Sequence, residues 1–138
     1  ASEDLLRLLT PEQLAAWHNY RVTKHGRDRM CHHVYKRSVN GEDLIDVLNL
    51  TDEQKRRIKE KAWQISEKHF LPTVKHPEKV DAFGVRGEQG KRARAMGDQK
   101  LYPWMVQEVL TDEQRAKLKK EQEQEQKAKE EKKDKKGK

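Results

Sequence analysis

The residues best suited to chemistry in this sequence are a single cysteine and six histidines. His18, His25 and His32 are spaced by seven residues, so an unbroken helix would place them on one face, with Cys31 and His33 beside them. Zinc needs three or four nitrogen or sulfur ligands that converge on a tetrahedron. No HxxxH or CxxH pair lies one helical turn apart, so the spacing does not favour a metal centre.

We therefore expect no metal and no cofactor, with His25, Cys31 and His32 as the weak candidates for ligands. A single cysteine excludes an internal disulfide framework and any CxxC zinc motif. No acidic residue is placed to orient a Cys–His pair, so we expect Cys31 to pack with Val34 and Tyr35 as a small buried side chain. We identify no catalytic residue and predict that the protein is not an enzyme.

Glycine and arginine are concentrated in residues 84–92, where backbone N–H groups could surround a phosphate. The segment lacks the GxxxxGK[ST] ending and follows no predicted strand. We interpret it as a flexible basic loop, part of an irregular Pro/Gly-rich connection over residues 71–90.

One sequence pattern occurs three times and predicts where helices begin. A Leu-Thr pair is followed by glutamine three residues after the threonine, and the intervening residues are mostly acidic or proline. The threonine can accept a hydrogen bond from a free N–H of the first turn, and the glutamine can reach back in a capping box. The predicted caps are Thr10, Gln13, Thr51, Gln54, Thr111 and Gln114.

Apolar residues between these starts recur at helical spacing, and only 6% of residues are aromatic. We predict an all-α fold without a sheet, a small bundle or hairpin of amphipathic helices over residues 1–118. Asn40-Gly41 is expected to form a turn, and Gly26, Gly97 and Pro103 are expected to interrupt helices. Residues 119–138 contain nine lysines and six acidic residues, which predicts an extended charged helix or tail.

Charge is unevenly distributed along this chain of 138 residues, which has a net charge of +7. Residues 20–37 contain six Lys or Arg and one Asp, and residues 85–100 contain five Lys or Arg against two acidic residues. Basic patches of this kind attract acidic partners, and the attraction weakens with salt.

We expect partner contacts to combine these cations with the cluster around Trp104, since large amphipathic side chains are enriched where a partner is bound. Trp63 is expected in the core, with Ile58, Ile65 and Phe70 near it. The predicted partner-binding residues are Arg21, Arg27, Arg29, Arg92, Arg94, Tyr102, Trp104 and Met105.

No run of 18 apolar residues is present, so we expect no membrane span. The first residues, Ala1 to Asp4, have neither a basic flank nor an apolar stretch. A small residue at position 1 is consistent with a signal peptide already removed, or with a trimmed initiator methionine.

The motif copies at residues 48–55 and 109–114 resemble those of the LTxxQ-motif family, the small exported helical proteins of the Spy/CpxP type. The similarity covers roughly residues 44–125. It implies an all-helical, often dimeric cradle in the bacterial periplasm, which holds unfolded or partly assembled clients without ATP. Some relatives bind zinc or dampen envelope-stress signalling. The motif at residues 9–13 is an addition here. The N-terminal extension with Trp17 and the basic segment at residues 20–37 suggests a dedicated partner.

These observations predict a chaperone-like protein or assembly factor that docks on an acidic client protein or larger complex in the periplasm. A homodimer is compatible with the resemblance. Two alternatives stay open. The basic composition, with a pI near 9.5, meets the first criterion for nucleic-acid binding, although no helix-turn-helix, zinc or RRM signature accompanies it. The histidines are the basis for the other alternative, a metal-responsive envelope-stress regulator.

Overall fold

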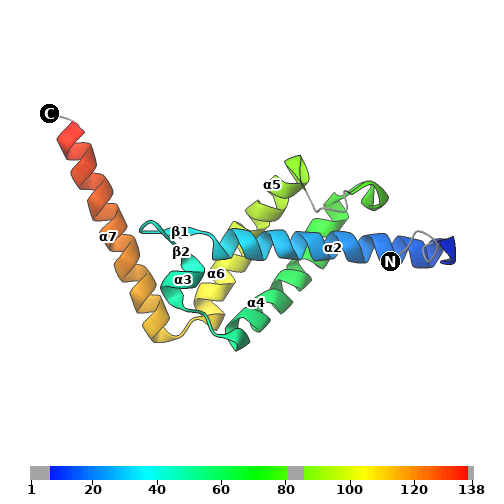
Figure 1. Ribbon diagram of the computed structural model, residues 1–138, viewed down its shortest axis with the longest axis horizontal. Coiled ribbons are helices and arrows are strands. Elements are labelled where there is room, and N and C mark those ends of the chain that lie inside the picture. The colour runs from blue at the N-terminus through cyan, green and yellow to red at the C-terminus, as the bar shows by residue number, and fades with distance from the viewer. Residues whose placement is uncertain (1–6, 81–85, 137–138) are drawn as a thin grey trace.

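The computed structural model describes residues 7–80 and 86–136, and helices form nearly all of this part of the chain (Figure 1). The predicted all-α fold is confirmed. The α-helices are α2 (Pro11–Tyr35), α3 (Leu44–Leu48), α4 (Asp52–Ile65), α5 (Gly87–Met96), α6 (Tyr102–Trp104) and α7 (Asp112–Lys136). The π-helical segments are η1 (Ser66–Phe70), η4 (Gly97–Leu101) and η5 (Met105–Val109), and the 3₁₀ turns are η2 (Leu71–Thr73) and η3 (Pro77–Lys79).

A two-stranded antiparallel hairpin corrects the expectation that the fold has no sheet. Strands β1 (Ser38–Val39) and β2 (Glu42–Asp43) pair around the predicted turn. Asn40 and Gly41 both have positive φ angles, 53° and 85°, as a two-residue hairpin loop requires. A strand of two residues is too short for an alternating apolar pattern to show in the sequence.

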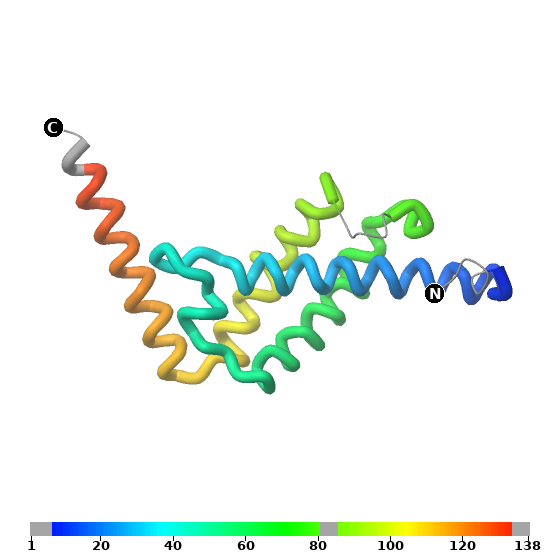
Figure 2. The backbone as a smooth tube through the Cα atoms, viewed as in Figure 1, coloured from blue at the N-terminus to red at the C-terminus, as the bar shows by residue number. Residues whose placement is uncertain are grey.

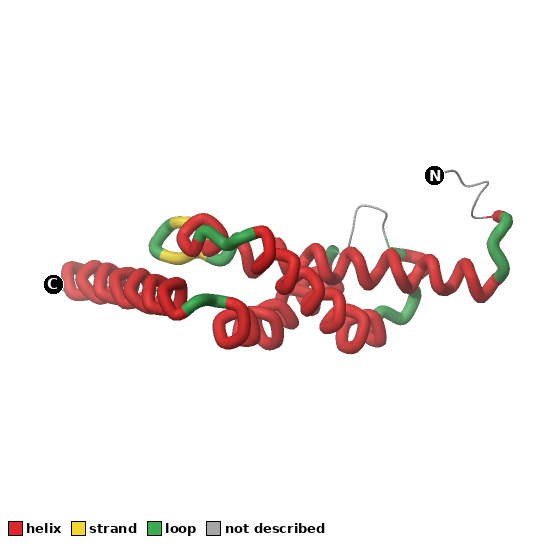
Figure 3. The backbone as a smooth tube through the Cα atoms, turned by 90° about the horizontal axis from the view of Figure 1, so that it is seen from below, coloured by secondary structure: helices red, strands yellow, loops and turns green. Residues whose placement is uncertain are grey.

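The longest helix of the body, α2, lies across an antiparallel pair of helical segments (Figures 1 and 2). One member of the pair is α4 with η1, and the other is the run from α5 through η5. Helix α2 packs against α4, α5, η4 and η1. Its N-terminal part projects beyond this body at one end, and α7 projects at the other (Figure 3).

The hydrophobic core lies where α2 crosses the helical pair and continues under the hairpin toward α7. Its largest side chains, Phe70, Met30, Leu44, Ile58 and Leu101, are completely buried. Leu118 is the last core residue of α7. Beyond it, the described side chains of α7 lack large apolar groups. Glu121 accepts a 3.0 Å hydrogen bond from Asn40 Nδ2 in the hairpin, and the rest of the helix depends on its own hydrogen bonds and Glu–Lys spacing.

Gly26 does not interrupt α2, contrary to the sequence-based expectation. It lies at the crossing with η1, where an added Cβ would come within 2.4 Å of Ser66 Oγ and 2.5 Å of Phe70 Cδ2. The close approach lets Ser66 Oγ donate a 2.7 Å hydrogen bond to the carbonyl of Thr23. The glycine is therefore needed for helix packing rather than for a break.

Gly97 and Pro103 also fail to break their helix, which runs from Gly87 to Val109. An added Cβ at Gly97 would lie 3.4 Å from the carbonyl oxygen of Met30, so this glycine again permits close packing on α2. Pro103 lies between the π-helical segments η4 and η5. Segments of this kind alter the hydrogen-bond pattern locally, which lets the helix continue past a residue without an N–H.

The connection predicted over residues 71–90 is partly ordered into short turns. It contains η2 and η3, and α5 already begins at Gly87. Residues Gly87–Arg92 are thus helical and do not form the basic loop we expected. Residues 81–85, which include Gly84 and Val85, lie outside the described residues. No helix in the described part of the chain has the length and apolar character needed to cross a membrane.

Candidate docking site

The second and third motif corners form a single hydrogen-bonded unit. Thr51 Oγ1 accepts from the N–H of Gln54 at 3.1 Å, while Gln54 Oε1 accepts from the N–H of Thr51 at 2.9 Å. Thr111 and Gln114 repeat both bonds at the same distances. These two capping boxes stand where the sequence places them, at the starts of α4 and α7.

The two motif glutamines also bind each other. Gln54 Nε2 lies 2.6 Å from Gln114 Oε1, and Gln114 Nε2 lies 3.1 Å from Gln54 Oε1. Each amide nitrogen also donates to a backbone carbonyl before the other motif, Gln54 to Val109 at 3.2 Å and Gln114 to Leu48 at 3.1 Å. The reciprocal pair therefore ties the start of α4 to the start of α7.

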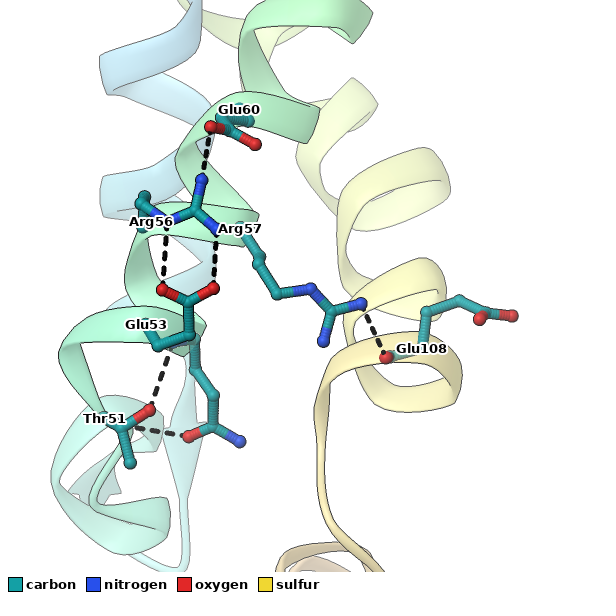
Figure 4. Close-up of polar contacts among 7 residues, drawn as sticks. Thr51, Glu53, Arg56, Arg57, Glu60 and Glu108 are labelled. Carbon is teal, nitrogen blue, oxygen red and sulfur yellow. Dashed lines mark hydrogen bonds and ion pairs between the residues drawn. The ribbon is translucent and has the colours of Figure 1, made fainter.

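Arginines reinforce this corner by binding the carbonyl groups at the end of η5. Arg57 reaches from α4 and donates to the carbonyl oxygen of Glu108 at 3.1 Å (Figure 4). Arg115 donates from α7 to the carbonyls of Val106 and Gln107, at 3.3 and 3.1 Å. These bonds satisfy acceptors that a helix end leaves without partners. Figure 4 also shows Arg56 between Glu53 and Glu60 on the exposed side of α4.

A basic groove of about 480 Å³ lies where the C-terminal part of α2 meets α5 and η4. We call this surface the basic groove throughout. It brings together the two basic segments that are far apart in the sequence. The lining residues are Arg29, His32, His33, Lys36, Arg37, Ser38, Arg94 and Asp98.

Positive charge dominates the basic groove, since four Lys or Arg face one carboxylate among its lining residues. Asp98 Oδ1 accepts from His33 Nε2 at 3.0 Å and from Arg37 Nη1 at 3.3 Å, so it orders the middle of the groove. Lys36 is paired with Asp43 at 3.0 Å, which raises the pKa of the ammonium group. Arg94 has no hydrogen bond or ion pair to any described residue.

Of the predicted basic partner residues, Arg29 and Arg94 line the groove and three others have structural contacts. Arg21 donates to the carbonyl of Val80 at 2.9 Å, and Arg92 lies 3.5 Å from the carbonyl of Thr73. Arg27 lies over the ring of Trp63, with a side chain only 15% exposed. These three arginines fix α2 and α5 to neighbouring segments.

The aromatic cluster around Trp104 is divided between surface and core. Tyr102 and Trp104 are half-buried, with Arg37 4.2 Å above the Tyr102 ring and Lys61 5.4 Å from the Trp104 ring. Met105 is completely buried in the core. The prediction that Met105 contacts a partner is therefore wrong for this fold, because its side chain is enclosed in the core while Tyr102 and Trp104 stay partly exposed.

The weak metal candidates do not come together. His25 and His32 are two turns apart on the continuous helix α2, a separation of about 10 Å along its axis. Cys31 is buried in the core, and burial raises the pKa of its thiol to about 12. In the described ranges, no three His, Cys, Asp or Glu side chains are grouped as a metal site would need.

Sequence reasoning missed Lys36 and Arg37 as groove residues, although both belong to the basic segment that it identified. It associated Trp17 with a partner but missed Tyr20, with which Trp17 forms an exposed aromatic surface on α2. Trp17 stacks on Tyr20 with ring centroids 6.1 Å apart, and Tyr20 contacts Trp63 at 5.4 Å. The spacing of Trp17 and Tyr20 on a helix that begins at Pro11 was the available signal.

Comparisons with known proteins give no further assignment for these features. No family model matches the chain, and no significant similarity is found to a curated protein or to a solved structure.

Proposed function

We propose that this protein is a non-enzymatic, chaperone-like protein or assembly factor that docks on acidic segments of a client protein or a larger complex. The observation that carries this proposal is the basic groove. Residues around Arg37 and around Arg94, separated by more than fifty positions in the chain, line one surface.

The chemistry of the groove fits carboxylate groups. Arginine presents a planar fork of N–H donors that binds a carboxylate through two parallel hydrogen bonds. Arg94 has no competing partner among the described residues, and Arg29 and Arg37 lie in the same groove. Because the groove is open to solvent, its charges act mainly by raising the rate at which an acidic surface is captured.

An apolar contact next to the groove would then prolong the complex. Tyr102 lies under Arg37, so a client seated on the guanidinium groups would reach the edge of this ring. Affinity differences within one interface reside mostly in the dissociation rate, which buried aromatic contacts lower. The groove would thus speed capture of the client, and contact with Tyr102 would slow its release.

The resemblance of the motif corners to the LTxxQ-motif family supports the same role. On that basis we propose a periplasmic location and action without ATP. We place the nucleic-acid and metal-responsive alternatives below this proposal.

The proposal is tested by comparing two unfolded clients of opposite charge. Reduced α-lactalbumin, which is acidic, and reduced lysozyme, which is basic, aggregate after their disulfides are broken. We expect the protein to suppress aggregation of the acidic client, less so as salt is raised, and to leave the basic client unaffected.

A duplex DNA of random sequence serves as the third probe in the same buffers. Tight DNA binding that falls steeply with salt, together with no effect on either client, would overturn the proposal in favour of nucleic-acid binding. Equal protection of the acidic and the basic client would also contradict it, because the groove would then play no part.

A further inference from the structure

The two motif corners that meet inside the chain are related to each other as the halves of a symmetric contact. In that contact each motif glutamine donates a hydrogen bond from its amide nitrogen to the amide oxygen of the other. Each also binds a carbonyl that precedes the other motif, at 3.2 and 3.1 Å. The two carbonyls lie at different positions, two residues before Thr111 and three before Thr51, but the exchange between the two amide groups is what a two-fold axis produces between identical surfaces.

The first motif corner has the same local geometry but no such counterpart. Thr10 N donates to Gln13 Oε1 at 2.9 Å, and Gln13 N donates to Thr10 Oγ1 at 3.1 Å, the distances found at the other two corners. The amide nitrogen of Gln13 binds no described residue. Two of the three motif copies pair with each other, and the third has no such pair among the described residues.

The unpaired corner lies on the most apolar exposed surface of the described chain. All the large hydrophobic side chains that are strongly exposed in the described part belong to it: Leu8 at 79%, Trp17 at 39% and Tyr20 at 50%. Gln13, Trp17 and Tyr20 are spaced i, i+4 and i+7, so they share one face of α2. We call this face, together with Leu8, the α2 tip.

Charge does not oppose contact between two copies at the α2 tip. Residues 8–20 contain one charged side chain, Glu12, in a chain that is 40% charged overall. The chain as a whole has a net charge of +7, which would repel a second copy, but residues 8–20 contain no Lys or Arg. The N-terminal part of α2 also projects beyond the body of the molecule (Figure 3).

We propose that two copies of this chain associate through their α2 tips, with Gln13 of one copy paired to Gln13 of the other across a two-fold axis. Leu8 and Trp17 of each copy cover the apolar surface of the other. The contact involves one helix end, which is smaller than the interface of an obligate dimer, so the association is reversible and depends on protein concentration.

This arrangement has a consequence for binding. The basic groove begins at Arg29, roughly 24 Å along α2 from Gln13, so dimer formation leaves it open. Two copies joined at their α2 tips carry two grooves at opposite ends. A client with two acidic segments would then bind more tightly than either groove allows alone.

Sedimentation equilibrium of the full chain tests the proposal directly. We expect a monomer–dimer equilibrium for the natural sequence, and at least tenfold weaker association for Gln13→Glu and Trp17→Ala. Glu at this position keeps the capping acceptor, removes the amide donor and places two carboxylates opposite each other. The matched control is Gln64→Glu, the same change at an exposed position on α4, which should associate as the natural sequence does.

A cysteine trap provides an independent readout, because a residue beside a two-fold axis lies next to its own copy. In a Cys31→Ser background, Gln13→Cys should form a disulfide-linked dimer under mild oxidation, and Gln64→Cys should not. A natural protein that stays monomeric at all concentrations would overturn the proposal. Dimers unaffected by Gln13→Glu and Trp17→Ala would overturn it too. Neither result depends on acidic clients, so this inference and the proposed function can fail separately.

Discussion

Gln114 makes more contacts than an ordinary helix cap, and its removal should show this. Thr111→Ala removes one cap bond and should lower the free energy of unfolding by about 1 kcal/mol. Gln114→Ala should cost about 2–3 kcal/mol, because it also leaves the partly buried amide of Gln54 and the carbonyl of Leu48 without their partner. Urea unfolding followed by circular dichroism measures both, and equal losses would contradict the linked-corner account.

Cys31 should make the protein sensitive to alkali. Burial raises the pKa of its thiol from the usual 9.0 to about 12, so the folded state favours the protonated form. Its stabilising contribution is complete below pH 9.0 and is lost as pH rises toward about 12, because only the unfolded state ionises readily there.

The measurement compares unfolding of the natural protein and Cys31→Ala across this alkaline range. We expect the difference in free energy between them to shrink as pH rises. Alkylation of Cys31 by iodoacetamide should likewise require unfolding. Rapid alkylation of the folded protein near neutral pH would show that the thiol is accessible.

At the residue level, the caps could be predicted because a capping box is local, and its Thr and Gln lie three positions apart. The Gln54–Gln114 pair could not, since its members are sixty positions apart and only the folded chain brings them together. Met105 was misassigned because its neighbours Tyr102 and Trp104 lie at the surface, while helical geometry turns Met105 inward.

At the level of elements, the crossing of α2 with η1 depends on the missing side chain of Gly26. Gly26→Ala should destabilise the protein by about 2–3 kcal/mol or more, because the new methyl group meets Ser66 and Phe70 in a close-packed interface. Helix propensity alone would predict the reverse, a gain of up to about 1 kcal/mol.

Thermal or urea unfolding of Gly26→Ala shows whether the substitution destabilises or stabilises the protein. The control is Gly41→Ala, which has open space around it but a φ angle of 85°, so any cost there reflects backbone strain alone. A stabilised Gly26→Ala variant would mean that α2 and η1 are not in close contact at this crossing.

The sequence predicted the helices but misjudged their continuity. Glycine and proline usually mark helix boundaries, and Gly26, Gly97 and Pro103 were interpreted that way. Each glycine instead lies where another segment packs closely, and the proline is accommodated between two π-helical segments. Tertiary packing therefore overrides a local propensity that is worth only about 1 kcal/mol for glycine.

At the scale of the whole molecule, the fold brings together basic segments that are far apart in the sequence. The sequence showed two basic segments, and the packing of α2 on α5 and η4 makes them one groove. The sequence could not show which of these basic side chains make structural contacts outside the groove. Arg21 and Arg27, which looked equivalent to Arg29, bind a carbonyl and an aromatic ring of the body.

The central claim, that the basic groove captures acidic proteins, is tested most directly by the association rate of fluorescently labelled, reduced α-lactalbumin. The variant is Arg94→Glu, and the matched control is Lys127→Glu, which alters the net charge equally on the projecting part of α7. We predict association about fivefold slower for Arg94→Glu at low salt, a difference that shrinks as salt rises, and a near-natural rate for Lys127→Glu. Equal slowing of both variants would show that only net charge matters, and unchanged rates in both would contradict the groove as the binding surface.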